Sequence, residues 1–135
     1  MPALDAASAR DLVAGARIAR LATVSPGGRP HIVPVCYALV GDAIVTAIDA
    51  KPKSTRQLRR LANLRSRPEA ALLVDHYAED WTRLWWVRVD GRAEIVDRDA
   101  AARDALAAKY PQYVAEPPEG PFVYLRPFGW TGWRP

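Results

Sequence analysis

The chain has 135 residues, of which half are hydrophobic and a quarter are charged, proportions typical of one water-soluble globular domain spanning residues 1–135. No apolar run reaches the roughly 20 residues of a membrane span, and no apolar block follows a basic start as in a secretory signal, so we expect a cytoplasmic protein with no membrane partner. The single cysteine, Cys36, excludes an internal disulfide and a metal cage built from several thiolates.

The first part of the chain predicts one helix and then a meander of strands. Asp5 can cap a helix that runs to about Ala16. Aliphatic and β-branched segments separated by turn residues then predict three strands, Ile18–Ser25, Pro30–Val40 and Ala43–Ile48. Pro34 interrupts the second strand and, because proline has no N–H to donate, marks a sheet edge or a bulge.

The second part alternates helices with strands. Ser54 is a suitable N-cap for a helix that runs to about Arg67 and is ended by Pro68, and Asp97 can cap a helix over Arg98–Lys109. Three further strands are predicted, Glu69–His76, Leu84–Val96 with a bend or bulge near Gly91, and Phe122–Trp133. Six strands in antiparallel meanders with inserted helices indicate a small α+β barrel with flanking helices.

One stretch of the chain carries its excess of positive charge. Residues 51–67 hold seven basic side chains and no acidic one, and without them the chain has 12 Lys and Arg against 15 Asp and Glu. On a helical wheel one face of this helix is predicted to be polar, with Arg56, Arg59, Arg60, Asn63 and Arg67. The opposite face is predicted to carry Leu58, Leu61 and Ala62, with Arg65 on this apolar side.

The start of this helix is the strongest candidate binding site. Lys51 and Lys53 precede the helix, Ser54 and Thr55 open it, and Arg56 follows. A helix N-terminus offers free N–H groups and the positive end of the helix dipole, so this group of side chains suits a phosphate or a carboxylate. Neither a nucleotide-triphosphate loop nor a dinucleotide fingerprint is present.

Two other interpretations of the basic stretch stay open at this point. It can be a solvated helix face with no ligand. It can also be a footprint for nucleic acid, although the remaining surface is net acidic and would repel a long phosphate backbone. A single site for a small anionic ligand fits the charge distribution better than a nucleic-acid partner.

No other segment carries recognisable reaction machinery. His31 and His76 have no ligand-spaced partners, so no metal site is expected. The segment Asp75–Tyr77 ends a strand and can line a pocket, and Cys36 is expected to be a buried, inert thiol. An enzyme with this sequence would therefore depend on a bound cofactor for its chemistry.

The strand that contains Trp85 and Trp86 places one tryptophan on each face. Alternation puts Trp86, Arg88 and Asp90 on one face and Trp85, Val87 and Val89 on the other. Both faces are thus expected to be covered, and in a chain of this size the second cover is either an inserted helix or another subunit.

Several of these segments resemble one known family. The segments Arg20–Val24, Pro26–Gly28 and Pro30–Val35 resemble the first hairpin of the pyridoxamine-5′-phosphate-oxidase-like split β-barrel family, and Lys51–Pro68 resembles its phosphate-binding loop and helix. Asp75–Tyr77, Trp81 and Leu84–Gly91 are similar to an actinobacterial branch of probable F420-dependent, or flavin/deazaflavin, oxidoreductases.

The resemblance implies a six-stranded antiparallel split β-barrel of the FMN-binding type, and a homodimer with the cofactor in a groove between subunits. Lys53, Ser54 and Thr55 would then hold the cofactor phosphate, helped by Lys51 and Arg56. Pro34, Val35 and Cys36 would follow the flat ring through backbone contacts, and Trp85, Trp86 and Arg88 would lie near the groove.

The resemblance also implies an activity, which is hydride transfer between coenzyme F420 and a small organic substrate. The C-terminal segment Arg126–Trp133 lacks the Arg and His pattern with which pyridoxamine-phosphate oxidases hold their substrate, so oxidation of vitamin B6 is not expected. The dense cationic helix suits F420, which carries a tail of glutamates, better than FMN. The alternatives are an FMN-binding oxidoreductase of the same fold and a protein that binds a flavin, a deazaflavin or a tetrapyrrole-like anion without catalysis.

Overall fold

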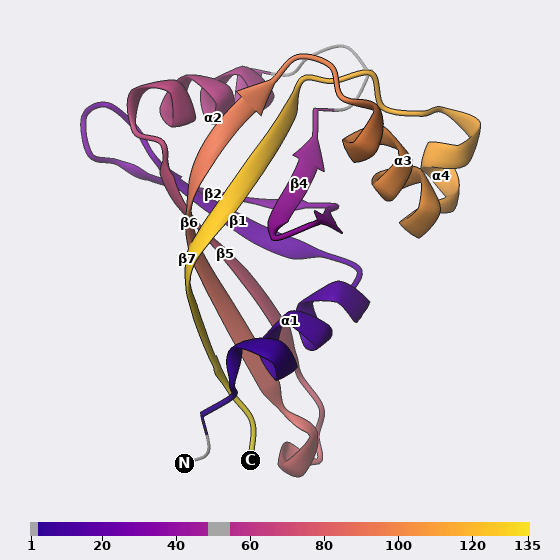
Figure 1. The fold of residues 1–135 in the computed structure, drawn as a ribbon. Helices are drawn as coiled ribbons and strands as arrows, with labels where there is room; N and C mark the ends of the chain where they lie inside the picture. Colours follow the sequence, from indigo (N-terminus) through magenta and orange to yellow (C-terminus); the bar gives the residue numbers. More distant parts are fainter. Residues whose placement is uncertain (1–2, 49–54) are drawn as a thin grey trace.

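The computed structural model describes residues 3–48 and 55–135, the side chains of residues 55–58 excepted. The described part contains one antiparallel sheet and flanking helices (Figure 1). The strands are β1 (Ala19–Val24), β2 (Pro30–Val35), β3 (Ala38–Val40), β4 (Ala43–Ala47), β5 (Glu69–His76), β6 (Trp85–Val96) and β7 (Phe122–Trp133). The helices are α1 (Ala6–Gly15), α2 (Thr55–Ser66), the 3₁₀ turn η1 (Trp81–Arg83), α3 (Ala100–Lys109) and α4 (Pro111–Ala115).

The order of the strands shows why the sheet curls into an open barrel. The order is β2-β1-β5-β6-β7-β4-β3, so β2 and β3 form the two opposite edges. Only Cys36 and Tyr37 separate these two strands in the chain. The edges must therefore come close together, yet they do not pair, and the barrel stays split between them.

The predicted count of six strands is wrong because the predicted strand Pro30–Val40 is divided at Cys36 and Tyr37. We call this place, where the two edges of the barrel meet without pairing, the seam. Tyr37 is fully buried, its O–H donates to the Val13 carbonyl at 2.5 Å, and its N–H donates to the Tyr110 hydroxyl at 3.1 Å. These contacts turn the backbone away from β1 and towards β4. Pro34 lies on the edge strand β2, as its missing N–H predicts.

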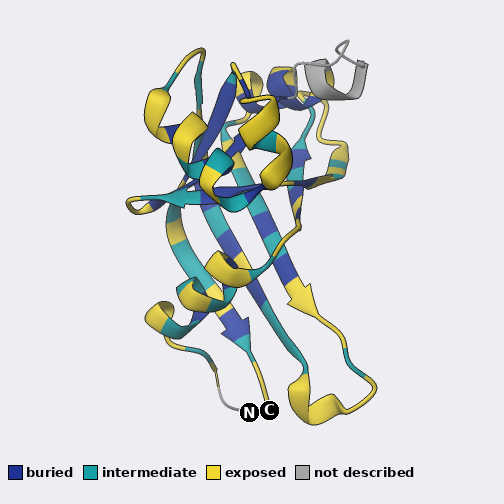
Figure 2. Ribbon diagram, turned by 90° about the vertical axis from the view of Figure 1, so that its right-hand side faces the viewer, coloured by how far each residue is buried: buried dark blue, intermediate teal, exposed yellow. Residues whose placement is uncertain are grey.

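The core lies on the concave face of the sheet. Buried and half-buried residues alternate along the long strands (Figure 2), with Leu72, Val87 and Val89 on the concave face. Helix α1 packs Ala9 and Val13 against this core, and α2 adds Leu61 and Leu64 near β6 and β7. Helix α3 instead covers β3 and β4 from the convex side, where Ala102 and Leu106 pack against Ala43, Val45, Phe122 and Tyr124.

The predicted irregularity near Gly91 is confirmed. Asp90 pairs with Gly129 and Gly91 pairs with Pro127, so Phe128 is the additional residue on β7. A β-carbon at Gly91 would lie 2.7 Å from the Arg126 carbonyl oxygen, so only glycine fits without a shift of the neighbouring strand. The bulge therefore explains the bend in the long β6–β7 hairpin.

The helix boundaries confirm one predicted cap and correct another. The Asp5 carboxylate accepts a hydrogen bond from the Ser8 N–H at 2.7 Å and caps α1 as expected. The cap of α3 is Asp99, which accepts from the Ala101 N–H at 3.1 Å, and not Asp97, because the helix begins two residues later than predicted. The short helix α4 was not predicted, although it starts at Pro111, a position that favours proline.

The two ends of the chain lie close together (Figure 1), since the Leu4 N–H donates to the Gly132 carbonyl at 3.0 Å.

Among the helices of the described part, none is long and apolar enough to cross a membrane.

Candidate functional site

The predicted anion site falls largely beyond what the structure describes. Lys51, Lys53 and Ser54 lie outside the described residues, and Thr55 and Arg56 are described only as backbone at the start of α2. The role assigned to these five residues therefore remains a prediction. The structure does show that α2 begins at Thr55, so Thr55 and Arg56 open a helix of 12 residues.

The helical wheel is wrong in part. Arg60 and Asn63 were expected on the exposed face, but both are buried, and Ala62 and Arg65, expected on the apolar face, are exposed. The reason is a polar contact under the helix, in which the Asn63 amide donates to the Thr23 hydroxyl on β1 at 3.1 Å. The contact rotates Asn63 towards the sheet, beside Leu61 and Leu64, and leaves a smaller basic surface on α2 than predicted.

On α2 and at the residue that follows it, the exposed basic residues that the structure describes are Arg59, Arg65 and Arg67. The Arg67 guanidinium donates to the Pro26 carbonyl at 3.1 Å, so it ties the end of α2 to the β1–β2 turn. The surface available to an anionic ligand on the described part of α2 is thus limited to Arg59 and Arg65.

A larger surface without cover lies on the convex side of β2, β1, β5, β6 and β7, and we call it the open face. Beyond the part of β7 that α3 covers, the residues of these strands that point away from the core are exposed or half-buried. They include Ile32, Pro34, Arg20, Ala22, Ala71, Leu73, Asp75, Trp86, Arg88, Asp90, Gly129, Thr131 and Trp133. None of these residues is buried within the described chain.

The open face brings together four of the predicted site residues. Strand register places Pro34, Arg20, Leu73, Arg88 and Thr131 in one row across the sheet. Asp75, Trp86 and Trp133 form the next row, and Cys36 lies at its end, two residues after Pro34. Three strand spacings separate Pro34 from Arg88, which is about 14 Å.

The remaining two predicted residues on these strands point the other way. Val35 is buried in the core, and Trp85 packs against the core beneath α1. The predicted alternation of Trp85 and Trp86 is therefore confirmed. Their assignment near one groove between subunits remains a prediction, with the two side chains on opposite faces of β6.

Two ion pairs arrange the charges of the open face. The Arg20 guanidinium lies 3.5 Å from the Asp75 carboxylate, and the Arg88 guanidinium lies 3.1 Å from the Asp90 carboxylate. All four groups are partly exposed, so these pairs orient side chains more than they stabilise the fold. Leu73 lies between Arg20 and Arg88 in their row, and the small residues Ala22 and Ala71 lie in the neighbouring row, where the face is shallow.

Cys36 lies at the seam and is exposed, so the expectation of a buried thiol is wrong. The strand that would have buried it ends at Val35. Close to the seam, the Lys109 Nζ lies 3.8 Å from the centre of the Tyr37 ring and 5.4 Å from that of Tyr110. This amine is buried and has no hydrogen-bond acceptor in the described part of the chain.

The surroundings of Lys109 shift its protonation. Burial lowers the pKa of the Lys109 amine to about 8, and the nearby Arg17 guanidinium acts in the same direction, while Cys36 acts in the opposite one. Burial also raises the pKa values of the Tyr37 and Tyr110 hydroxyls. The sequence does not single out Lys109, since a lysine in the last turn of a helix is usually a solvated C-terminal residue.

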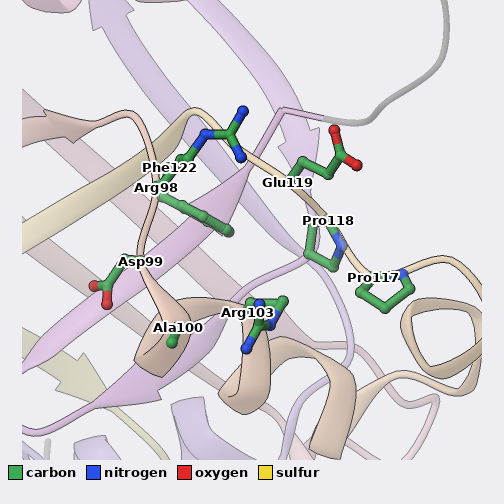
Figure 3. Close-up of a pocket in the computed structure, with 8 residues that line it drawn as sticks. All are labelled: Arg98, Asp99, Ala100, Arg103, Pro117, Pro118, Glu119 and Phe122. Atoms are coloured by element: carbon green, nitrogen blue, oxygen red, sulfur yellow. The ribbon is translucent and has the colours of Figure 1, made fainter.

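Two cavities of about 430 Å³ each open on the described surface. One lies between the start of α3 and the loop before β7 (Figure 3), where Arg98 and Arg103 face Pro117, Pro118 and Glu119 over Phe122. Among the predicted cofactor-binding residues whose side chains the structure describes, none lines this cavity.

The other cavity lies between α1 and the ends of β1, β5 and β6. Its lining includes Asp75, His76 and Trp85, so the expectation that the end of β5 lines a pocket is confirmed for Asp75 and His76. Tyr77 does not line it and is exposed, where its hydroxyl accepts from the Trp81 indole N–H at 3.4 Å.

This combination of an open antiparallel barrel, a convex face without cover and a basic helix agrees with the family comparison. The family model for pyridoxamine 5′-phosphate oxidase matches residues 6–128. The chain therefore belongs to the pyridoxamine 5′-phosphate oxidase family. No curated protein matches the chain in sequence.

Solved structures share the fold. A conserved hypothetical protein from Mycobacterium tuberculosis is 24% identical, with a TM-score of 0.78 over 97% of this chain and 85% of its own. An FAD-binding protein from Mesorhizobium loti is 21% identical, with a TM-score of 0.70 over 97% of this chain and 95% of its own. HutZ, the heme storage protein from Vibrio cholerae, is 15% identical, with a TM-score of 0.71 over 93% of this chain and 92% of its own. At these identities the likeness shows the fold alone.

Proposed function

We propose that the chain is a flavin-type oxidoreductase that uses the deazaflavin coenzyme F420, with FMN as the alternative cofactor, to oxidise or reduce a small organic substrate. The family match and the FAD-binding structural relative support a flavin-type ligand. The open face supports its location, because Pro34, Cys36, Trp86 and Arg88 lie in two adjacent rows on it.

The open face fits a flat ring with polar edges. It is shallow at the neighbouring residues Ala22 and Ala71, next to Leu73, and this part of the face suits a planar group that lies against the strands. Arg20 and Arg88 lie in the next row, on either side of Leu73, and offer N–H donors to carbonyl groups at the edge of a ring. When bound there, the cofactor would supply the hydride acceptor or donor, and the protein would supply orientation and exclusion of water.

The acidic end of the cofactor is assigned to the start of α2. Lys53, Ser54 and Thr55 would hold its phosphate, helped by Lys51 and Arg56, through the charge and free N–H groups of a helix N-terminus. We propose F420 over FMN because an acidic tail beyond the phosphate would have further cations at Arg59 and Arg65. Arg60 is buried, so it is not among the cations on the surface of α2 that an acidic tail would meet.

We also propose a homodimer in which the open face is the contact surface. Trp86 and Trp133 are paired across β6 and β7 and are half-buried, and Ile32 is 63% exposed at the edge strand. Large apolar side chains gathered on one uncovered sheet face are typical of a protein–protein interface. A second copy on this face would enclose the ring between the subunits, as the family resemblance implies.

A second candidate function is binding without catalysis, as a carrier or store of a flavin or a tetrapyrrole-like ligand. It is favoured by the fold shared with a heme storage protein. The two functions differ in turnover: a reductase reduces an electron acceptor repeatedly in the presence of a reductant for the cofactor, whereas a store does not.

The direct test is a titration of the pure protein with F420 and with FMN, followed by ligand fluorescence. We expect saturable binding of one ligand per chain, with F420 bound more tightly than FMN. Tighter FMN binding would transfer the proposal to the alternative cofactor. If neither F420 nor FMN binds saturably, the proposed oxidoreductase function is contradicted.

A further inference from the structure

The cavity between α1 and the ends of β1, β5 and β6 adjoins the open face, with which it shares Asp75. It is lined by Asp11, Leu12, Gly15, Ala16, Arg17, Ile18, Asp75, His76 and Trp85. Its volume of about 430 Å³ is in the range of small-molecule pockets. Leu12, Ala16 and Trp85 pack against the barrel core, so this wall of the cavity is fixed by the fold.

One side of the cavity is an aromatic wall. His76 and Trp85 are cross-strand partners on β5 and β6, and their rings stack with centroids 6.3 Å apart and planes 24° from parallel. Stacked rings at the end of a sheet provide a flat surface for another ring. Ala16 and Ile18 add aliphatic contacts, so the cavity favours a planar aromatic group over a flexible or strongly hydrated one.

The charges around the cavity indicate which charge an aromatic ligand bound there should carry. The Arg17 guanidinium donates to the Lys109 carbonyl at 2.7 Å and lies 4.8 Å from the Tyr110 ring centre, so its charge is held at the seam. The Asp75 carboxylate is paired with Arg20. Asp11 has no ion pair or side-chain hydrogen bond in the described chain, and it leaves a carboxylate at the rim.

We propose that this cavity binds a planar aromatic ring that carries a protonated amine. The ring stacks against Trp85 and His76, and the ammonium group meets the Asp11 carboxylate. The aromatic wall of this site is separate from the proposed flavin site, because Trp85 lies on the opposite face of β6 from Trp86 and Arg88, while Asp75 belongs to both the cavity and the open face.

The test compares three naphthalene probes that share one ring system, 2-naphthylmethylamine, 2-naphthalenemethanol and 2-naphthoate, by isothermal titration calorimetry of the full chain at pH 7. We expect saturable binding of the amine, about fivefold tighter than the alcohol, with the carboxylate weakest. An equal affinity for all three probes, or no saturable binding of the amine, overturns the proposal.

Two substitutions locate the binding. Gly15 lines the cavity, and a β-carbon added there would meet no atom within 4 Å, so Gly15→Phe fills the cavity without a backbone clash, and Gly15→Ala is the matched control. We expect Gly15→Phe to weaken all three probes at least tenfold and Gly15→Ala to leave them within twofold. Asp11→Asn should lower the affinity of the amine to that of the alcohol, whereas Asp104→Asn, at an exposed position of α3, should change nothing.

The outcomes also separate this proposal from the flavin proposal. Unchanged amine binding in both Gly15→Phe and Asp11→Asn would place the ligand elsewhere and overturn the inference. If Gly15→Phe fails to fold, as judged by circular dichroism, Asp11→Asn alone decides. A protein that binds the amine through Asp11 but neither F420 nor FMN would support the cavity and refute the proposed function.

Discussion

Lys109 carries the one side-chain amine among the described residues, and its buried position makes the stability of the protein depend on pH. Its Nζ is buried against the Tyr37 and Tyr110 rings, with Arg17 and Cys36 as the charged or ionisable neighbours. Burial lowers the pKa of the amine from 10.5 to about 8. The unfolded chain therefore holds this proton up to a higher pH than the folded chain does.

We expect the free energy of unfolding to rise between pH 8 and about 10, because in this range the unfolded state binds more protons. The side chain is half-buried, so solvent screening limits the expected gain to about 1 kcal/mol. Above pH 10 the gain is opposed, since the buried Tyr37 and Tyr110 hydroxyls have raised pKa values and ionise first in the unfolded chain. Urea denaturation at pH 7.5 and pH 9.5 measures the change.

The variant that isolates this effect is Lys109→Met, which keeps the length and apolar stem of the side chain. Between pH 7.5 and pH 9.5, the free energy of unfolding of this variant should change only through the titration of other groups. At pH 7.5 its free energy of unfolding should exceed that of the wild type. Arg103→Met, at an exposed position of the same helix, is the control and should keep the wild-type rise. The same pH dependence in Lys109→Met and the wild type would contradict the account of the seam.

At the scale of secondary-structure elements, the β6–β7 hairpin depends on Gly91. A β-carbon there would lie 2.7 Å from the Arg126 carbonyl oxygen and 2.9 Å from the Leu125 side chain. We expect Gly91→Ala to lower the free energy of unfolding by about 1–3 kcal/mol, the usual range for overpacking. The measurement is the midpoint of urea denaturation.

Gly27→Ala in the β1–β2 turn is the matched control. Its new β-carbon would meet only the Ser25 hydroxyl oxygen, at 3.9 Å, so its stability should stay within about 0.5 kcal/mol of the wild type. Equal stability of the two variants would show that the hairpin can shift at the bulge without strain.

The elements differ in how far the sequence could predict them. The bounds of β5 and β7 agree with prediction, because Pro68 and Pro121 mark the residues after which the two strands begin. The faces of β6 agree because a period of two leaves no freedom once one side is buried. The division into β2 and β3 could not be predicted, since it depends on contacts from Tyr37 to Val13 and Tyr110, far along the chain.

The candidate site shows the same limit. Alternation along the strands predicts that Trp86 and Arg88 share a face, but only the sheet register shows that Pro34 and Arg20 lie in the same row as Arg88. The wheel of α2 failed at Asn63, because its hydrogen bond to Thr23 is a tertiary contact that a helical period does not contain. The cavity beneath α1 similarly combines residues from α1, β5 and β6.

At the scale of the whole molecule, the open face predicts an assembly of two chains. We expect Trp86→Glu to separate the dimer, because a charge would replace an aromatic side chain at the proposed contact. Sedimentation equilibrium should give twice the mass of one chain for the wild type and the mass of one chain for this variant.

Trp81→Glu is the control for that experiment. Trp81 lies on the η1 turn and is 67% exposed, away from the rows that form the open face, so this variant should stay dimeric. A wild-type protein with the mass of one chain at micromolar concentration would contradict the proposed homodimer.

The central claim is that the segment before α2 holds the acidic end of a flavin-type cofactor whose ring lies on the open face. Fluorescence titration of F420 into wild type, Lys53→Ala and Arg65→Ala tests it most directly. Loss of one charge-assisted hydrogen bond should weaken binding to Lys53→Ala by about 1.5–3 kcal/mol, roughly tenfold to a hundredfold, while Arg65→Ala should lose much less. A Lys53→Ala variant that binds F420 as tightly as the wild type would contradict the claim.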